Sequence, residues 1–223
     1  MLRFGEKWPS QNSFDRDADR ARSAYDRPQR FSANAIYELP FGRTNAGVLG
    51  RLWGGWQIGT LLTFQSGTPF GPLNGSDPTA ALSGIDALVG NAIRPNLNTS
   101  LPIASMTLTE IRQAGGTSLF GTLAPCARIA TTLTCAPNDR FGNVGRNVLR
   151  GDGIGNLDLS VSKTTRIFGE RHRLQIRADF FNLTNTRNFG IPEARISNPA
   201  GFLDEGSTDG GNRRIFVGLK YSF

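Results

Sequence analysis

The stretch from Ile215 to Phe223 constrains the fold more than any other, because its side chains alternate between two kinds. One set is wholly apolar and consists of Ile215, Val217, Leu219, Tyr221 and Phe223. A period of two predicts a β-strand with different environments on its two sides. A strand of about 9–11 residues with one apolar face can cross a bilayer once in a barrel wall. A half-buried strand of a soluble β-sandwich would alternate in the same way.

Four segments further upstream repeat the pattern. The predicted strands lie near residues 31–39, 56–64, 156–165, 172–181 and 214–223. Lys163 is an exception, because it falls among the apolar side chains of its strand, and we interpret it as a lysine that snorkels to a membrane interface.

The connections between these strands are unequal in length. Long external loops are expected near 67–153 and 182–213, whereas 43–55 and the turn around Phe168 are short. Outer-membrane barrels combine short periplasmic turns with long external loops in this way. The sequence therefore predicts an all-β fold, an antiparallel transmembrane β-barrel fragment of about five strands with long external loops.

One local signal stands out inside the longer loop. Thr107 and Glu110 have the spacing of a capping box, which predicts a short helix that ends near Gly115 and Gly116. The rest of the loop shows little periodicity.

Composition agrees with strands and loops. The 223 residues include 27 Gly and 12 Pro, and no apolar run reaches the length of a transmembrane helix. The formal charge of +7 comes mainly from scattered arginines without a nucleic-acid-binding motif, so no nucleic-acid partner is predicted. The start of the chain lacks the apolar core of a signal peptide, and we expect a C-terminal piece of a longer protein.

Signals for catalysis or metal binding are weak. The only histidine, His172, has no evident nucleophile or acid partner. Four aspartates (Asp15, Asp17, Asp19 and Asp26) have calcium-loop spacing, but Arg20 stands where a glycine is needed, which favours a solvated loop. The glycine-rich stretch 151–155 precedes a strand, whereas a phosphate loop precedes a helix. We predict no enzymatic activity, no metal site and no cofactor.

Strand alternation also assigns faces. The side chains predicted to face lipid are Leu174, Ile176, Ala178, Val217 and Leu219. The polar side chains predicted to face the lumen are Asp158, Arg173, Gln175, Arg177, Asp179 and Lys220.

Cys126 and Cys135 are the only cysteines, and both fall in the loop expected outside the cell. Thiols are not kept reduced there, and the separation lets the chain turn back far enough to bring the two Cα atoms within disulfide range. We predict a disulfide that stiffens the loop, with two unrelated thiols as the alternative.

Several short motifs together resemble the C-terminal barrel of TonB-dependent outer-membrane transporters of the Oar-like branch. They occur in family order along nearly the whole chain: Tyr25–Phe31, Tyr37–Gly42, Gly55–Gln57, Phe64–Phe70, Arg94–Asn96, Asn156–Ser160, Phe180–Asn185 and Tyr221–Phe223. The resemblance implies a complete barrel of about 22 strands, closed by an N-terminal plug and coupled to TonB through a periplasmic segment.

The function expected from this resemblance is a partial barrel wall for uptake of a bulky substrate in the cell outer membrane. The chain alone is not expected to transport, because it lacks plug and TonB-contacting segment. Expected partners are outer-membrane lipid, the remaining barrel and plug, and TonB only through the missing N-terminal part. Leu219, Tyr221 and Phe223 are expected to signal to the barrel-insertion machinery. The alternative is a non-transporting outer-membrane surface-binding or adhesive protein.

Overall fold

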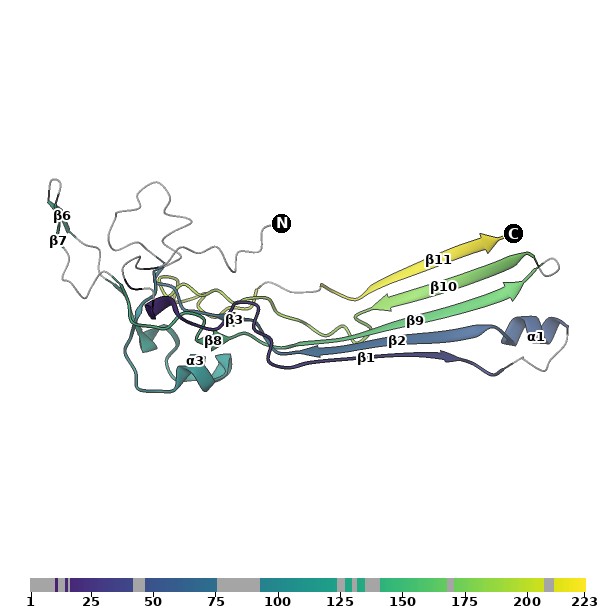
Figure 1. Cartoon of the computed structure of the whole chain (residues 1–223), viewed down its shortest axis with the longest axis horizontal. Helices are drawn as coiled ribbons and strands as arrows, with labels where there is room; N and C mark the ends of the chain where they lie inside the picture. Colours follow the sequence, from purple (N-terminus) through teal and green to yellow (C-terminus); the bar gives the residue numbers. More distant parts are fainter. Residues whose placement is uncertain are drawn as a thin grey trace. The chain divides into compact units, whose positions relative to one another are not determined.

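The computed structural model describes residues 11, 15, 17–41, 47–75, 93–123, 127–129, 132–134, 141–167, 171–206 and 211–223. The chain divides into two compact units (Figure 1). The loop unit consists of Met1–Pro28, Gly67–Asp152 and Phe189–Asp209. The sheet unit consists of Gln29–Ser66, Gly153–Asn188 and Gly210–Phe223. Over the described ranges, none of the helices has both the length and the apolar character needed to span a membrane.

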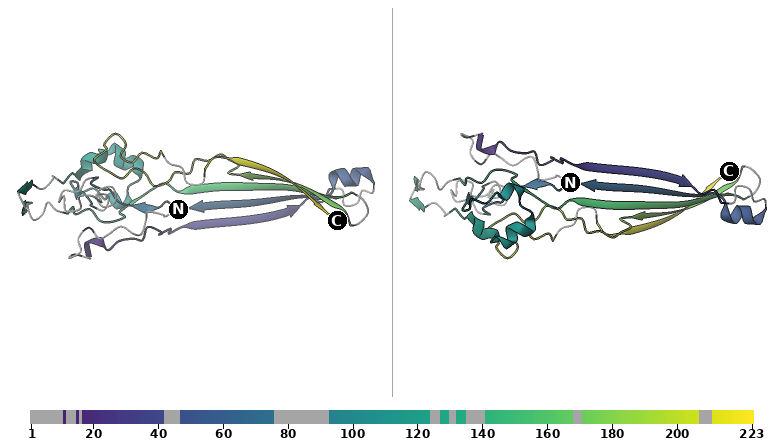
Figure 2. Two further views of the ribbon diagram at one scale, coloured as in Figure 1. Left: turned by 90° about the horizontal axis from the view of Figure 1, so that it is seen from above. Right: turned by 90° about the horizontal axis from the view of Figure 1, so that it is seen from below.

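The sheet unit is one open antiparallel sheet, seen from two sides in Figure 2. Its strands are β1 (Arg30–Glu38), β2 (Trp56–Gln65), β9 (Ile154–Arg166), β10 (Arg173–Phe181) and β11 (Arg214–Ser222). They pair in the order β1-β2-β9-β10-β11, so each strand lies beside the previous one along this meander. Each begins and ends within two residues of its predicted range. The predicted all-β antiparallel class is confirmed.

Strand register gives the sheet one continuous apolar face. Two adjacent rows that cross all five strands are Tyr37, Ile58, Val161, Ala178, Val217 and Ala35, Thr60, Leu159, Phe180, Ile215. Because side chains alternate along every strand, the residues between these rows form the opposite face. The alternation read from single strands is therefore kept in register across the whole sheet.

A short helix, α1 (Val48–Trp53), separates β1 from β2, where the sequence predicted only a turn. The sequence predicted a turn there because glycines, which favour turns, stand at both ends of the helix. Gly47 precedes the helix at φ 81°, and Gly55 follows it at φ 76°. A Cβ on Gly55 would lie 2.1 Å from the carbonyl oxygen of Thr164 in β9, so only glycine fits this close approach.

The loop unit contains short elements only. Its paired strands are β3 (Pro69–Phe70) with β8 (Leu149–Arg150), β4 (Asn96–Leu97) with β5 (Phe120–Gly121), and β6 (Ala127–Ile129) with β7 (Thr132–Thr134). Its helices are η1 (Asp17–Asp19), η2 (Ile103–Ser105), α3 (Leu108–Gln113) and η3 (Gly116–Leu119). The predicted capping box is confirmed, because Thr107 and Glu110 bond reciprocally at the start of α3.

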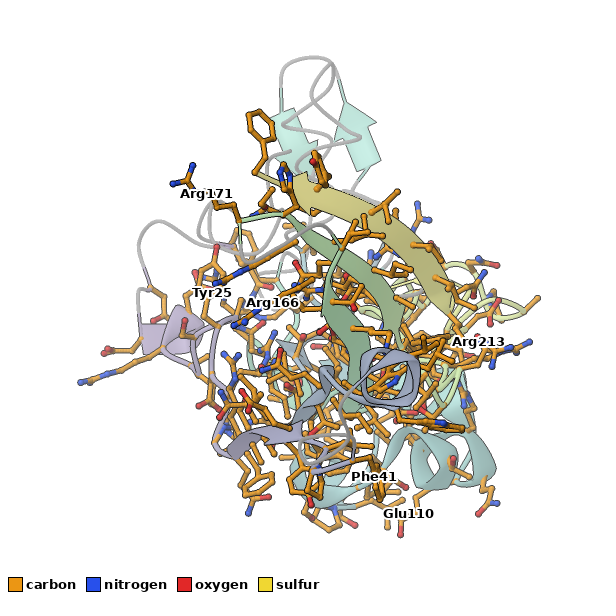
Figure 3. All side chains as sticks on the ribbon, turned by 90° about the vertical axis from the view of Figure 1, so that its right-hand side faces the viewer. Tyr25, Phe41, Glu110, Arg166, Arg171 and Arg213 are labelled. Carbon is orange, nitrogen blue, oxygen red and sulfur yellow. The ribbon has the colours of Figure 1, made fainter. Side chains whose placement is uncertain are left out.

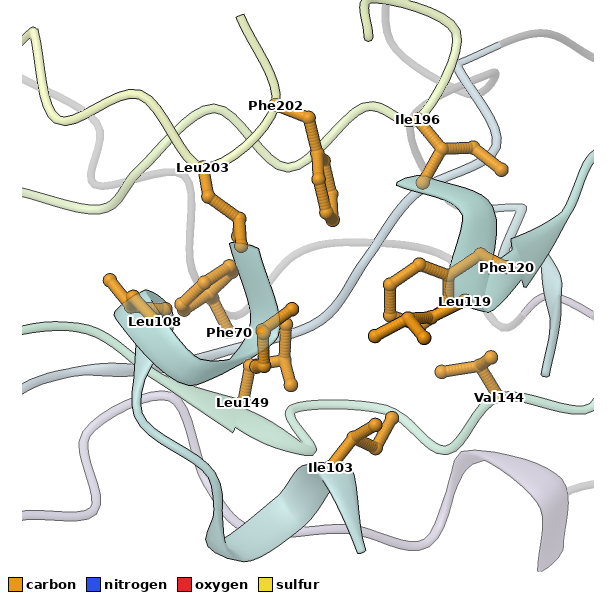
Figure 4. Close-up of a cluster of buried hydrophobic side chains, with 11 residues drawn as sticks. Phe70, Ile103, Leu108, Leu119, Phe120, Val144, Leu149, Ile196, Phe202 and Leu203 are labelled. Atoms are coloured by element: carbon orange, nitrogen blue, oxygen red, sulfur yellow. The ribbon is translucent and has the colours of Figure 1, made fainter. Parts of the chain in front are cut away.

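Several of these elements enclose a hydrophobic core (Figure 4). The core consists of Phe70, Ile103, Leu108, Ile111, Leu119, Phe120, Val144, Leu149, Ile196, Phe202 and Leu203. The segments expected as long loops, 67–153 and 182–213, thus contribute buried side chains to a common core, which the sequence did not predict. Sequence periodicity could not reveal this core, because each short segment contributes only one or two side chains.

Candidate functional site

The six side chains predicted to face the lumen share one face of the sheet. Gln175 pairs with Lys220 across β10 and β11, and Arg177 and Asp179 pair with serines of β9. This face lies opposite the one that carries Ile176 and Leu219. The common face is observed, whereas its exposure to a lumen stays a prediction.

Charge on the polar face is unevenly distributed along the strands. Arg173 is the cross-strand neighbour of Arg166 in β9. Lys220 of β11 lies in the next row of the same face, opposite Gln175. Arg177 donates from Nε to Asp179 Oδ1 at 2.8 Å. The α1 end of the polar face therefore concentrates cations that can attract a polar or anionic solute.

Asp158 shapes the end of β10 as well as contributing charge. Its Oδ1 accepts hydrogen bonds from the backbone N of Asn182 at 2.8 Å and from Asn156 Nδ2 at 2.8 Å. Asn182 is buried in the left-handed region at φ 52°, and its side chain bonds both backbone groups of Thr186. Asn182 was missed as a site residue, although it lies within the Phe180–Asn185 motif.

The C-terminal strand ends in an aromatic group. The Tyr221 hydroxyl lies 2.6 Å from His172 Nδ1, and the two rings stack with centroids 5.9 Å apart. Phe223 is 91% exposed and its ring lies 5.8 Å from that of Tyr221. Leu219 is exposed on the same strand. The three predicted assembly residues thus form one exposed apolar stripe on β11, and their role in assembly stays a prediction.

Cys126 and Cys135 lie outside the described residues, so their predicted disulfide stays a prediction.

Arg94 is the principal ionic anchor of the loop unit. Its buried guanidinium forms an ion pair with Asp19 and donates to the carbonyl oxygens of Val144 at 2.7 Å and Ala18 at 2.9 Å. Gln11 adds further hydrogen bonds, to the Arg94 backbone N and to Gly142. The interpretation of the aspartate-rich segment as a solvated loop is therefore wrong for Asp19.

A second set of polar contacts joins the segment before β1 to the segment after β2. Arg150 forms an ion pair with Asp26 at 2.8 Å and donates to the carbonyl oxygen of Gly67 at 2.8 Å. Arg27 donates to Thr68 Oγ1 at 2.7 Å. Asp26, Arg27, Gly67 and Thr68 lie in two of the family-like motifs, whereas Arg150 lies outside them, and the sequence did not predict these contacts.

An open polar pocket of about 240 Å³ lies beside the Arg94 anchor. Its lining residues are Asp19, Ala21, Arg22, Ser23, Ala24, Arg146 and Asn147. Asn147 Nδ2 donates to the carbonyl oxygen of Arg22 and so joins the two walls. Among the described residues, neither Arg22 nor Arg146 forms an ion pair.

Two carboxyls of the loop unit titrate in opposite directions. The Arg195 guanidinium, bonded at 2.8 and 2.6 Å, lowers the pKa of Glu193 to about 2. Burial, followed by the charge of Asp152, raises the pKa of Glu205. Its Oε1 is buried without a hydrogen-bond partner, and Arg112 approaches the other oxygen only to 3.6 Å. No group of three or more potential metal ligands occurs among the described residues.

A two-faced antiparallel sheet with long loops at one end is the architecture of an outer-membrane β-barrel protein. A family model described as an outer membrane beta barrel domain matches residues 4–216. The chain belongs to this family, and it is an outer-membrane protein. No curated protein and no solved structure matches it.

Proposed function

We propose that this chain forms part of the barrel wall of an Oar-like TonB-dependent transporter that takes up a bulky substrate. The single observation that carries the proposal is the division of the sheet into an apolar face and a polar, cation-bearing face. The first faces lipid and the second lines the transport path. The ordered motifs between Tyr25 and Phe223 support the TonB-dependent branch in particular.

The remaining partners follow from the same proposal. Both edge strands pair with strands of the remaining barrel, and β11 presents its apolar stripe to the barrel-insertion machinery. A plug and a TonB-contacting segment belong to the N-terminal part of such a transporter. The loop unit receives the substrate, and catalysis has no place in this function.

Face assignment is tested by cysteine labelling in outer-membrane vesicles, with Cys126 and Cys135 replaced by Ser. Gln175→Cys and Ile176→Cys are adjacent in β10 and differ only in the face that they occupy. A water-soluble maleimide should label the first and leave the second, which a lipid-soluble maleimide labels. Equal labelling of both positions by the soluble reagent would contradict the proposal.

Coupling is tested on the complete transporter, solubilised in mild detergent and passed over immobilised periplasmic TonB domain. Retention supports transport. Loss of retention by a barrel that still shows heat-modifiable migration favours the second candidate function, a surface-binding or adhesive protein. The observation behind this second candidate is the loop unit itself, which has enough buried core to present a defined binding surface.

A further inference from the structure

The outer surface of α1 is apolar. Val48 is 70% exposed, Leu52 58% and Trp53 62%, although all three are large hydrophobic side chains. Val48 and Leu52 are four residues apart and lie side by side on the helix surface, and Trp53 lies about 100° farther around the helix, so the three side chains cover a broad apolar arc, the α1 patch. An exposed patch of this kind marks an interaction surface.

α1 is held firmly at one end of the sheet unit, the end faced by the viewer in Figure 3. The ammonium group of Lys163 donates to the carbonyl oxygens of Leu52 at 2.6 Å and Gly54 at 2.9 Å. It also lies 5.0 Å from the centroid of the Trp56 ring. These contacts satisfy carbonyls at the C-terminal end of the helix, where a cation is favourable.

Lys163 also shows which face of the sheet α1 continues. In the strand register it lies between Trp56 and Ile176, on the apolar face. The C-terminal end of α1 is therefore anchored to a side chain of the apolar face rather than of the polar one. The lysine that breaks the alternation of β9 thus has a specific contact that keeps its charge out of hydrocarbon.

We infer that α1 is an interfacial helix, which inserts Val48, Leu52 and Trp53 between the lipid headgroups and acyl chains of the periplasmic leaflet. The inference rests on the proposed assignment of the apolar face to lipid. The short connections and the C-terminus lie at this end of the sheet, which is the periplasmic end of an outer-membrane barrel. Tryptophan and short apolar helix faces with a flanking lysine suit this zone of a bilayer.

Depth-dependent quenching tests the inference on the complete barrel that contains this chain, reconstituted into phospholipid bilayers with every tryptophan outside this chain replaced by Phe. The variant Trp8→Phe/Trp56→Phe retains Trp53 as its only tryptophan. Bromine atoms high on the acyl chain should quench Trp53 about twofold more strongly than bromine atoms near the chain end, because interfacial helices lie at the headgroup boundary. Aqueous acrylamide should quench it weakly.

Two single-tryptophan controls separate the possible failures. Trp8→Phe/Trp53→Phe retains Trp56 on the apolar face, and Gln175→Trp in a background without other tryptophans reports the polar face. Quenching of Trp56 but not Trp53 by brominated lipid would overturn the interfacial helix and leave the face assignment intact. If brominated lipid quenches neither Trp53 nor Trp56, both the interfacial helix and the face assignment are wrong. Equal lipid quenching of Trp53 and of the tryptophan at position 175 would also overturn both.

Discussion

The two units of the chain use apolar side chains in opposite ways. In the sheet unit, every residue of β1 and β11 is exposed, and large apolar groups such as Val217 and Leu219 point outward. In the loop unit, the apolar groups point inward, and Ile111 and Leu203 are completely buried. The loop unit is organised like a small globular domain in water. The sheet unit requires lipid on one face and neighbouring strands at both edges.

The largest expected effect concerns the Arg94 anchor. Arg94→Ala removes the ion-pair partner of Asp19, whose side chain is 12% exposed, and breaking a buried ion pair costs about 3–5 kcal/mol. Hydrogen exchange of the full chain should show lost protection in peptides around 94–97 and 141–145. Strand peptides should keep their protection, and the exposed neighbour Arg20→Ala should change little. Equal loss in β9 and β10 would mean that the two units are not energetically separate.

The second prediction addresses the sheet. Ile176→Arg should destabilise the barrel in bilayers by about 2–4 kcal/mol, because it places a charge against hydrocarbon. Gln175→Arg on the opposite face should be tolerated. Denaturant unfolding monitored in bilayers measures both. Equal costs for the two substitutions would show that the sheet does not separate lipid from water.

The predicted disulfide would give the loop unit an additional restraint. Closing the short loop between Cys126 and Cys135 should contribute about 2–3 kcal/mol. Mass spectrometry of protein purified without reductant should show the linked peptides two hydrogens lighter than the free thiols. Complete alkylation before reduction would refute the pairing.

The smallest expected effect is the pH dependence of the stability of the loop unit. The Glu193–Arg195 pair stabilises the folded state above the ordinary glutamate pKa of 4.5, and this contribution is lost as pH falls through about 2. Glu193→Gln should cost about 0.5–1 kcal/mol near pH 7 and nothing at the acid extreme. Protease susceptibility of the loop unit across the pH range provides the measurement.

Glu205→Gln is the matched opposite case. Its pKa is raised, so the ionised carboxyl destabilises the folded state at neutral pH, and the penalty disappears as the group becomes protonated. The substitution should therefore stabilise the loop unit near pH 7, with a benefit that shrinks toward acid pH. Destabilisation at neutral pH would mean that the contact with Arg112 outweighs burial.

Sequence could predict the parts of the fold that depend on neighbours along the chain. Strand alternation is local, and so is the capping box at Thr107, which is why the sheet and α3 were predicted. The contacts of Asp19 with Arg94 and of Phe120 with Phe202 could not be predicted, because each joins residues that lie far apart in the sequence. Leu203 is a further example, since its positive φ of 64° has no local signal in a leucine. For the site, alternation identified the polar set, but the hydrogen bond between the backbone of Asn182 and Asp158 joins residues 24 positions apart and is seen only in the structure.

The wide spacing of the loop-unit contacts has a consequence for the order of events during synthesis. Gln11 is made 131 residues before Gly142, to which it bonds, and the core is incomplete until Phe202 and Leu203 have been made. Gln11 and the earlier side chains of the core therefore reach their final partners only after the residues up to Leu203 have been made. Contacts between such distant residues also fold slowly.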